Sequence, residues 1–180
     1  MNRLLPVLAV FTLLLGTSER PANAADDATV CHKSSGAEAL AACDRAIASG
    51  GFDGLELARL HTSRGVERRR AKDIDGAIAD YDAAVKINAK DQFAFNNRAN
   101  LQRDKGDLAR AIADYSEAIR IDPGYTAAYV NRGLVYESLK DPDRARADYQ
   151  QVLAMPPRYA NGPGGQDMAR KRLAALSKSP

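Results

Sequence analysis

The fold of this chain is decided by residues 107–123, DLARAIADYSEAIRIDP, because the same pattern recurs once before and once after this stretch at equal spacing. The earlier copy is DIDGAIADYDAAVKINA at 73–89, and the later copy is DPDRARADYQQVLAMPP at 141–157. Each copy begins with an aspartate and carries an Asp-Tyr pair near its middle, with alanines around it. The copies begin at residues 73, 107 and 141, so the period is 34 residues. A fixed period of 34 residues indicates an array of stacked helical repeats.

Each copy has the features of the second helix in a helix pair. Asp73, Asp107 and Asp141 stand where a carboxylate caps the free N–H groups of a helix and complements its dipole. In each copy an alanine precedes the tyrosine by four residues, so the two share one buried face. Small residues at 65, 99 and 133 mark where a first helix crosses closely. The pattern predicts helix pairs at 58–71 with 75–88, 92–105 with 108–121, and 126–139 with 142–154.

An arginine column and an aspartate column repeat at the same period. The arginines are Arg64, Arg98 and Arg132, and the aspartates are Asp80, Asp114 and Asp148. Because antiparallel helices meet at the small residues, the two columns come within reach of each other. We therefore expect structural Arg–Asp pairs within or between neighbouring repeats. A row of arginines that faces a ligand is the alternative.

The flanking segments carry weaker forms of the pattern. Residues 38–47 repeat the second-helix pattern with Cys43 in the position of Tyr81, so residues 35–49 are interpreted as a half-repeat that caps the N-terminal end. A Gly/Pro loop at 161–165 precedes an amphipathic helix expected over 166–177. The apolar side chains expected to cover the last repeat are Met168, Leu173, Ala174 and Leu176. The basic side chains expected in water are Arg170, Lys171 and Arg172.

Residues 1–24 have the features of a secretory signal peptide. Arg3 supplies a positive charge, residues 4–15 form an apolar run, and residues 22–24 read Ala-Asn-Ala, the pattern of a cleavage site. The run falls short of the ~20 residues that span a bilayer, and an uncleaved anchor is the alternative. We expect cleavage after Ala24 and a periplasmic or secreted product, with no membrane span in the mature chain.

The chain contains two cysteines, Cys31 and Cys43. In an oxidising compartment an even number of cysteines favours a disulfide, which would tie an irregular N-terminal segment to the helix that carries Cys43. Closing a loop of this size stabilises a fold by about 3 kcal/mol in the chain-entropy description. Two free thiols are the alternative. The spacing does not fit a zinc site, so no metal ion and no cofactor are expected.

The repeating columns resemble the tetratricopeptide repeat, whose motif places aromatic, small and proline residues at fixed positions within each repeat. The middle repeat matches this motif at Phe95, Ala99, Ala111, Tyr115, Ala118 and Pro123. The resemblance implies an all-α, right-handed helix-turn-helix solenoid with three repeats, an N-terminal half-repeat and a C-terminal capping helix. The expected boundaries are 1–24 for the signal peptide, 25–57 for the N-terminal cap with its disulfide, 58–91, 92–125 and 126–159 for the repeats, and 160–180 for the capping helix and tail.

The resemblance also implies a protein or peptide binder, because in this family the first helices line a concave groove. By register, the polar, charged and aromatic groove positions are Arg59, Thr62, Arg69, Arg70, Phe93, Asn96, Asn97, Asn100, Arg103, Asn131 and Glu137. The apolar groove positions are Val66, Ala127, Val130 and Leu134. Arginines and amides suit an acidic or C-terminal carboxylate segment through charge-assisted hydrogen bonds. Solvated arginines and structural asparagines are the alternative.

Composition and motifs argue against the other function classes. A net charge of +3 gives no electrostatic footprint of a nucleic-acid binder. The two histidines, His32 and His61, belong to no metalloprotease motif, and neither a hydrolase elbow nor a phosphate loop is present in the sequence. The sequence therefore predicts a non-enzymatic interaction module whose partner is an unidentified protein or peptide, with an acidic segment as one candidate. A self-associating envelope assembly factor without a groove ligand is the alternative.

Overall fold

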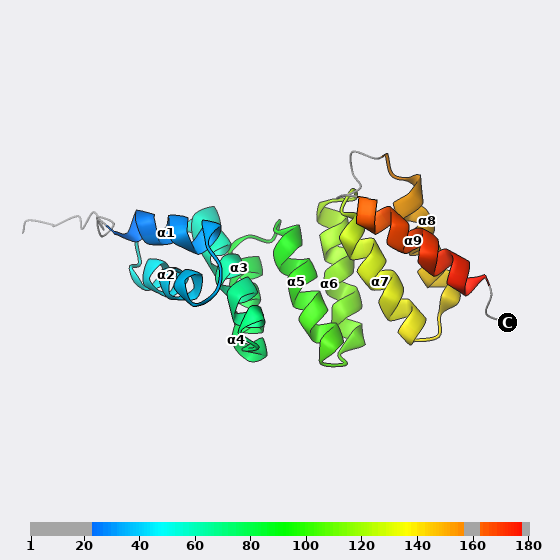
Figure 1. Ribbon diagram of the computed structural model, residues 1–180, viewed down its shortest axis with the longest axis horizontal. Coiled ribbons are helices and arrows are strands. Elements are labelled where there is room, and N and C mark those ends of the chain that lie inside the picture. Colours follow the sequence, from blue (N-terminus) through cyan, green and yellow to red (C-terminus); the bar gives the residue numbers. More distant parts are fainter. Residues whose placement is uncertain (1–22, 157–162, 178–180) are drawn as a thin grey trace, which may run out of the picture.

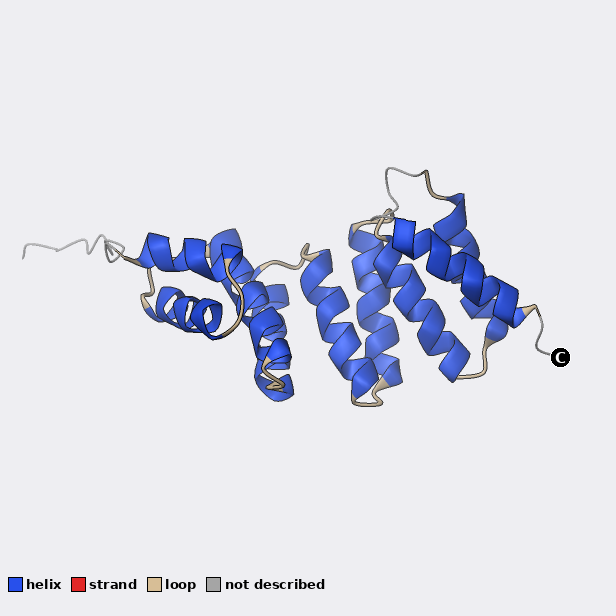
Figure 2. Ribbon diagram, in the orientation of Figure 1, coloured by secondary structure: helices blue, strands red, loops and turns tan. Residues whose placement is uncertain are grey.

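The computed structural model describes residues 23–156 and 163–177, and within these ranges the chain forms helices and no strands (Figures 1 and 2). The helices are α1 (Ala24–Lys33), α2 (Ala37–Ala48), α3 (Gly54–Arg70), α4 (Ile74–Ile87), α5 (Gln92–Asp104), α6 (Leu108–Ile121), α7 (Thr126–Ser138), α8 (Pro142–Ala154) and α9 (Pro163–Leu176). In the described part of the chain, no helix is both long and apolar enough to cross a bilayer. Residues 1–22 of the predicted signal peptide lie outside the described residues.

The helices stack as pairs along the long axis of the molecule (Figure 1). The pairs α3/α4, α5/α6 and α7/α8 are the three predicted pairs, except that α3 begins at Gly54 rather than at residue 58. Each first helix also contacts the first helix of the next pair, from α1 through α3, α5 and α7 to α9, whereas among the described residues no such contact joins the second helices. The array is therefore narrower on the side of the first helices, which we call the inner face.

A tyrosine of the second helix forms the centre of each repeat. Tyr81, Tyr115 and Tyr149 are fully buried. A Cβ atom added to Gly65 would lie 2.7 Å from Cε1 of Tyr81, and one added to Gly133 would lie 2.6 Å from Cε1 of Tyr149. Carbon atoms pack favourably at about 3.5–4.0 Å, so the rings of Tyr81 and Tyr149 take the space that a side chain at these glycines would need.

The turn within each repeat places one residue in the left-handed conformation. Lys72, Gly106 and Lys140 hold the same position in successive repeats and have φ values of 65°, 83° and 58°. The aspartate after each of them donates its N–H to the carbonyl five residues earlier, as in a Schellman ending. The same aspartate accepts, through its side chain, the N–H three residues further on. The predicted caps are therefore part of one repeated turn, formed at Asp73, Asp107 and Asp141.

The N-terminal unit is a complete helix pair, whereas the sequence pattern predicts a half-repeat after an irregular segment. α1 packs on α2 and α3 through Ala24, Ala28 and Cys31, whose spacing forms one buried stripe. This stripe is short and built of small residues, so its helical period is weak in the sequence. A disulfide joins Cys31 to Cys43 with the Cα atoms 4.8 Å apart. It ties the first helix to the second, as the glycine and tyrosine contacts do in the repeats.

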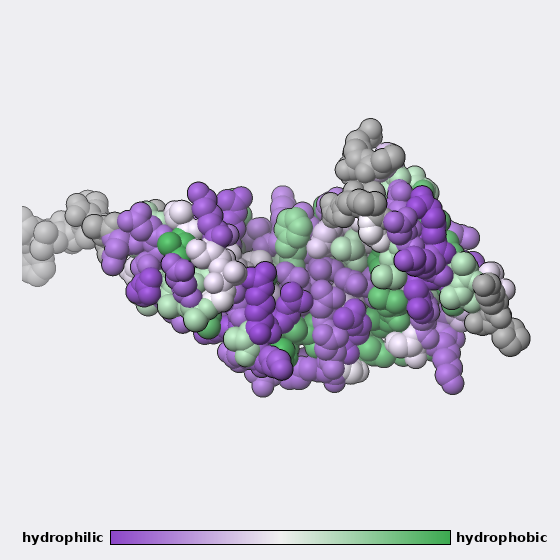
Figure 3. Space-filling view, in the orientation of Figure 1, coloured by the Kyte–Doolittle hydropathy of each residue, from purple (hydrophilic) through white to green (hydrophobic). Residues whose placement is uncertain are grey.

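The C-terminal helix α9 follows α8 and contacts α7, as each earlier first helix contacts the pair before it. Ala169 is fully buried, and Leu173 and Leu176 pack against the core of the last repeat. Met168 is 43% exposed and Ala174 is exposed, so the expected burial of these two side chains was wrong. The helix is turned so that the i, i+4, i+7 stripe faces the core. Apolar side chains are visible beside the hydrophilic surface of α9 (Figure 3).

We expect Gly133→Ala to destabilise the protein, because the new methyl group would meet the ring of Tyr149 in a packed core. Overpacking of this kind costs about 1–3 kcal/mol, which exceeds the up to ~1 kcal/mol that alanine gains over glycine within a helix. Urea denaturation measures the difference. The control is Gly164→Ala in α9, where an added Cβ meets nothing within 4 Å. A Gly133→Ala protein as stable as the unchanged chain would contradict the close crossing.

Candidate functional site

The inner face contains a cavity of about 540 Å³ near its N-terminal end. Side chains of α1, α3, α5 and the turn between α4 and α5 surround it. They are His32, Arg59, Thr62, Ser63, Asn88, Lys90, Asp91, Gln92 and Phe93. We call this space the inner-face cavity. It brings together three of the predicted groove residues, Arg59, Thr62 and Phe93.

The inner-face cavity combines an aromatic wall with positive charge. Phe93 is 53% exposed and packs edge-on against the ring of Tyr125, with the ring centroids 5.4 Å apart. The side chain of Arg59 is largely exposed, and its guanidinium lies 4.0 Å from the carboxylate of Glu56. Lys90 is exposed and forms no ion pair within the described ranges. An entering anion would therefore find two cations that are weakly compensated.

The carboxylate of Asp91, also in the cavity wall, is engaged by its own chain. Its Oδ1 accepts the backbone N–H groups of Phe93 and Ala94, each at 3.0 Å, and so caps α5. Its Oδ2 accepts the hydroxyl of Thr62 at 3.1 Å. These bonds direct the negative charge toward the helix and away from a ligand.

Three further predicted arginines lie toward the other end of the first helices. Arg70 pairs with Glu67, and Arg103 lies 2.9 Å from Asp104. Arg69 is exposed, and its guanidinium forms neither a hydrogen bond nor an ion pair with the described residues. Arg69 is therefore the predicted groove arginine most available to an external anion.

The predicted amides of the groove are mostly bonded within the chain. Asn131 donates to Oδ1 of Asn96 at 3.1 Å, and Asn96 is buried. Asn100 accepts the hydroxyl of Tyr115 at 2.7 Å. Asn97 is half-buried, and its side-chain amide has no hydrogen bond within the described residues. Asn96 is therefore not an open groove residue, and Asn100 and Asn131 contact a ligand only with the atoms that these bonds leave free.

Glu137 is covered by the C-terminal helix. Its Oε1 accepts from Nε of Arg172 at 2.8 Å and from the hydroxyl of Tyr149 at 2.5 Å. The hydrogen bond from Arg172 lowers the pKa of Glu137. The expectation that Arg172 lies in water was wrong, and Glu137 anchors α9 rather than lining an open groove.

The hydroxyl of Tyr81 is buried and has no hydrogen-bond partner in the described part of the chain, unlike those of Tyr115 and Tyr149. Val66 holds the position in the first repeat that Asn100 holds in the second, so the first repeat lacks the amide that Tyr115 uses. Burial raises the pKa of Tyr81 to about 12.

The structure brings the arginine and aspartate columns together within each repeat. Nη2 of Arg64 lies 2.6 Å from Asp80, Nε of Arg98 lies 2.7 Å from Asp114, and Nη2 of Arg132 lies 2.7 Å from Asp148. Each arginine also donates through Nη1 to the preceding helix pair. The three acceptors are Asp44 at 2.9 Å, Asp82 at 2.6 Å and Ser116 at 2.8 Å. The pairs therefore connect neighbouring units, and the arginine heads do not form a ligand-facing row.

Asp80 is the most heavily bonded of these carboxylates. Besides Arg64, it accepts from Nδ1 of His61 at 3.0 Å and from Nη1 of Arg68 at 2.9 Å. Burial alone would raise the pKa of Asp80, but the hydrogen bonds from His61 and Arg64 outweigh it and lower the pKa. His61 therefore serves the ion-pair network rather than a catalytic site.

Six residues of the inner-face cavity were not predicted from the sequence: His32, Ser63, Asn88, Lys90, Asp91 and Gln92. Asp91 carried a usable signal, because an aspartate directly before a helical stretch is a cap candidate. His32 carried none, since α1 was not expected to be a helix. Its ring contacts Oγ of Ser63 at 2.9 Å and Oε1 of Glu56 at 3.2 Å.

In the described part of the chain, no group of three or more His, Cys, Asp or Glu side chains could hold a metal ion.

Sequence models of two related families match the C-terminal half of the array. One, described as a TPR repeat, matches residues 99–140, and the other, described as a tetratricopeptide repeat, matches residues 126–159. A search of the curated proteins finds no match to this sequence.

Solved structures with the same fold are numerous, and three illustrate the likeness. The first TPR domain of Spaghetti (RPAP3), bound to the HSP90 peptide SRMEEVD, is 25% identical with a TM-score of 0.60, over 70% of this chain and 98% of that chain. The TPR domain of Arabidopsis OM64 is 26% identical with a TM-score of 0.59, over 67% and 97% of the two chains. The Sgt2 TPR domain from Aspergillus fumigatus is 24% identical with a TM-score of 0.60, over 70% and 80%.

The stacked pairs, the buried tyrosine crossings and the repeated turns define an all-α protein of the helical-repeat class. The matching family models and the structural neighbours confirm the resemblance. The chain has the fold of tetratricopeptide repeat proteins, and its residues 99–159 match tetratricopeptide repeat models.

We expect Asp80→Asn to destabilise the protein by roughly 3–5 kcal/mol at neutral pH, because it leaves buried cations without their carboxylate. Since the pKa of Asp80 is lowered in the fold, its stabilisation is complete above the unfolded pKa of about 3.9 and is lost as the pH falls through the folded value. The free energies of unfolding of the two proteins should therefore converge on acidification. Urea denaturation between pH 7 and pH 3 measures this.

The control for this substitution is Asp143→Asn, which removes an ion pair whose carboxylate side chain is 90% exposed. Such surface pairs contribute about 0–1 kcal/mol, so little change is expected at any pH. A gap between Asp80→Asn and the unchanged chain that is as wide in acid as at neutral pH would contradict the assignment.

Proposed function

We propose that this protein is a non-enzymatic interaction module that binds a polypeptide segment on its inner face, beginning at the inner-face cavity. The observation that carries the proposal is the contrast along this face. Exposed Phe93 and weakly paired cations surround the cavity, whereas Asn96, Asn100 and Glu137 farther along are bonded within the chain. The Spaghetti domain, of similar fold, is solved with a bound HSP90 peptide, which supports a peptide as the class of ligand.

We propose further that the preferred segment is acidic. Arg59 and Lys90 border the cavity, and Arg69 lies on the same helix as Arg59, about three turns away. These three cations have at most one distant carboxylate partner among the described residues. The neighbouring carboxylate of Asp91 is turned toward α5 and Thr62. Charge-assisted hydrogen bonds to an acidic peptide would satisfy these cations.

The test uses a fluorescein-labelled octapeptide of alternating glutamate and leucine, with a lysine–leucine octapeptide as the opposite charge. We expect saturable binding of the glutamate peptide by fluorescence anisotropy, weakened at least tenfold by the double variant Arg59→Glu, Arg69→Glu. The physical reason is the exchange of two attractive charges for repulsive ones, each worth about 0.5–1.5 kcal/mol at a solvated site. Binding should also weaken with added salt.

The matched control is Arg120→Glu, which reverses an exposed arginine on the second helix α6. It should leave the affinity unchanged. Loss of binding by Arg120→Glu equal to that by the double variant would show unspecific charge attraction and would overturn the inner-face assignment. Equal binding of the lysine peptide would overturn the acidic preference alone.

We also propose that the chain is exported through cleavage of residues 1–24. The apolar run at 4–15, the Ala-Asn-Ala pattern and a disulfide between the two cysteines support this. Cleavage after Ala24 removes one buried residue of α1 and leaves Ala28 and Cys31 to pack on α2.

Expression of the full chain in a Gram-negative host tests export. We expect a periplasmic product whose N-terminal sequence starts at Ala25 and whose cysteines resist alkylation until a reductant is added. A product that stays in the cytoplasm with its full N-terminus would refute the proposal. The variant Cys31→Ser, Cys43→Ser separates export from disulfide formation, since its N-terminus should be processed in the same way.

A further inference from the structure

Arg68, Gln102 and Tyr136 hold the same position in successive repeats, and each repeat has a different kind of side chain there. In the third repeat, Tyr136 is 8% exposed and packs in the same core cluster as Ile112. The Cζ atom of Arg132 lies 5.9 Å from the centroid of the Tyr136 ring, and that of Arg144 lies 4.4 Å from it. The ring therefore lies within cation–π distance of two guanidinium groups.

In the first repeat, a charged side chain takes the same position. The guanidinium of Arg68 donates to the carbonyl of Gly76 at 3.3 Å and to Asp80 at 2.9 Å. Its long side chain thus reaches the second helix of its own repeat.

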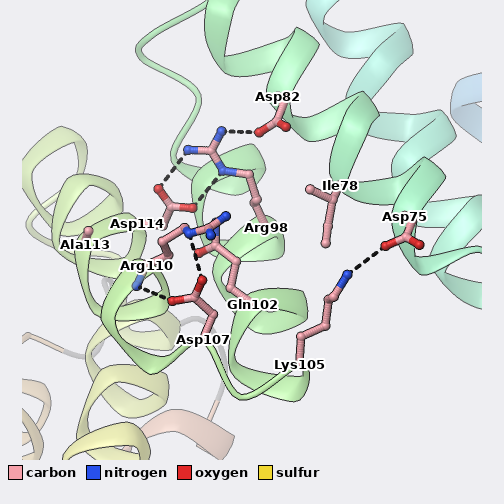
Figure 4. A pocket seen from close by; sticks show the side chains of 10 residues that line it. All are labelled: Asp75, Ile78, Asp82, Arg98, Gln102, Lys105, Asp107, Arg110, Ala113 and Asp114. Atoms are coloured by element: carbon pink, nitrogen blue, oxygen red, sulfur yellow. Dashed lines mark hydrogen bonds and ion pairs between the residues drawn. The ribbon is translucent and has the colours of Figure 1, made fainter.

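In the second repeat the column holds Gln102, and a cleft of about 580 Å³ is present beside it (Figure 4). Its walls include Ile78, Arg98 and Arg110, which are the counterparts, one repeat earlier, of the residues around Tyr136. Arg98 contacts the ring of Phe95 at 5.4 Å, as Arg132 contacts that of Tyr129 at 5.8 Å. The second repeat therefore has the frame of an aromatic site without the aromatic ring.

The amide of Gln102 supplies a second observation. Gln102 is 9% exposed, and its Oε1 is buried without a hydrogen-bond partner among the residues that the structure describes. A buried acceptor of this kind costs about 1–3 kcal/mol when it is left unpaired. Figure 4 shows the amide beside the guanidinium of Arg110, with Arg98 on the same helix as Gln102.

The charges of the cleft favour a neutral ligand over an anion. Arg98 pairs with Asp82 and Asp114, Arg110 pairs with Asp107, and Lys105 pairs with Asp75. Each cation in the walls thus already has a carboxylate. Guanidinium groups paired at their edges still offer their faces to an aromatic ring.

We propose that this cleft binds a tyrosine side chain of a partner polypeptide, with its ring between Arg98 and Arg110 and against Ile78, and with its hydroxyl donating to Oε1 of Gln102. The partner's tyrosine ring would enter the cleft from solvent. It would occupy the position in the second repeat that the chain's own Tyr136 ring occupies in the third. The lining residues belong to α4, α5, α6 and the turn between α5 and α6, and none of them lines the inner-face cavity. The site does not depend on the acidic peptide proposed above.

The test is a titration of the whole chain with N-acetyl-tyrosinamide, followed by NMR at the Ile78 methyl groups and the Nε–H groups of Arg98 and Arg110. We expect saturable shifts with a millimolar dissociation constant, which is typical of a single side chain without its peptide. N-acetyl-phenylalaninamide should bind more weakly, because it leaves Oε1 of Gln102 unpaired. N-acetyl-leucinamide should give no saturable shifts.

Two variants locate the binding. Gln102→Tyr places the chain's own ring in the cleft, so it should abolish the shifts and raise the melting temperature. Arg110→Ala removes one guanidinium from a largely exposed position, so it should weaken binding about threefold to tenfold while the fold persists. The double variant Arg59→Glu, Arg69→Glu should bind N-acetyl-tyrosinamide normally, which separates this site from the inner-face proposal.

The proposal is overturned if no saturable shift appears at these groups, or if Gln102→Tyr gives the same titration as the unchanged chain. Should Gln102→Tyr fail to fold, unaltered binding by Arg110→Ala would overturn it equally. A tyrosine-containing octapeptide that binds no more tightly than N-acetyl-tyrosinamide, with the same loss on Arg110→Ala, would replace the polypeptide by a free aromatic molecule as the ligand.

Discussion

Each helix pair from α1 through α8 depends on a close crossing, where a buried side chain of the second helix lies on a small residue of the first. Tyr81 lies on Gly65, Tyr149 lies on Gly133, and a disulfide takes this place between α1 and α2. The crossing allows the two helices to approach closely over a short contact. The turn between the two helices, with its left-handed residue and its aspartate cap, lies at a fixed number of residues from the crossing. The constant period of the array follows from repeating the crossing and its turn together.

The Arg–Asp pairs act on a different level, between units. A buried ion pair gives little net stability when it is compared with apolar packing, because its charges lose their hydration. The Nη1 partner of each arginine, however, lies on the preceding second helix, and at Arg64 it is Asp44 of the disulfide-bonded pair. A shift of one unit against the next would leave these charges buried and unpaired. The columns therefore fix how the units stack more than how firmly each one folds.

Features that recur in each repeat were predictable from sequence, because comparing three copies shows which residues have the same structural role. The helix pairs, the Asp caps and the Arg–Asp pairing followed from columns. α1 did not, since a ten-residue helix with a stripe of small residues has no copy to compare with. The contact of α9 with Glu137 was not predictable either. α9 does not follow α8 at the spacing of the repeat, and only the rotation of α9 brings Arg172 to Glu137. A tertiary contact that forms once in the chain produces no repeated pattern in the sequence from which it could be predicted.

The departures from the repeat are also where the molecule offers surface to a partner. Where a column keeps its usual residues, the chain satisfies itself, as with the guanidinium of Arg98 and the carboxylate of Asp114. Where a column changes, a group is left without its internal partner: Val66 leaves the hydroxyl of Tyr81 unbonded, and Gln102 leaves a cleft in which Tyr136 has no counterpart. A repeat array folds on what its copies share. In this chain, both proposed binding sites lie where one copy carries residues that the others lack.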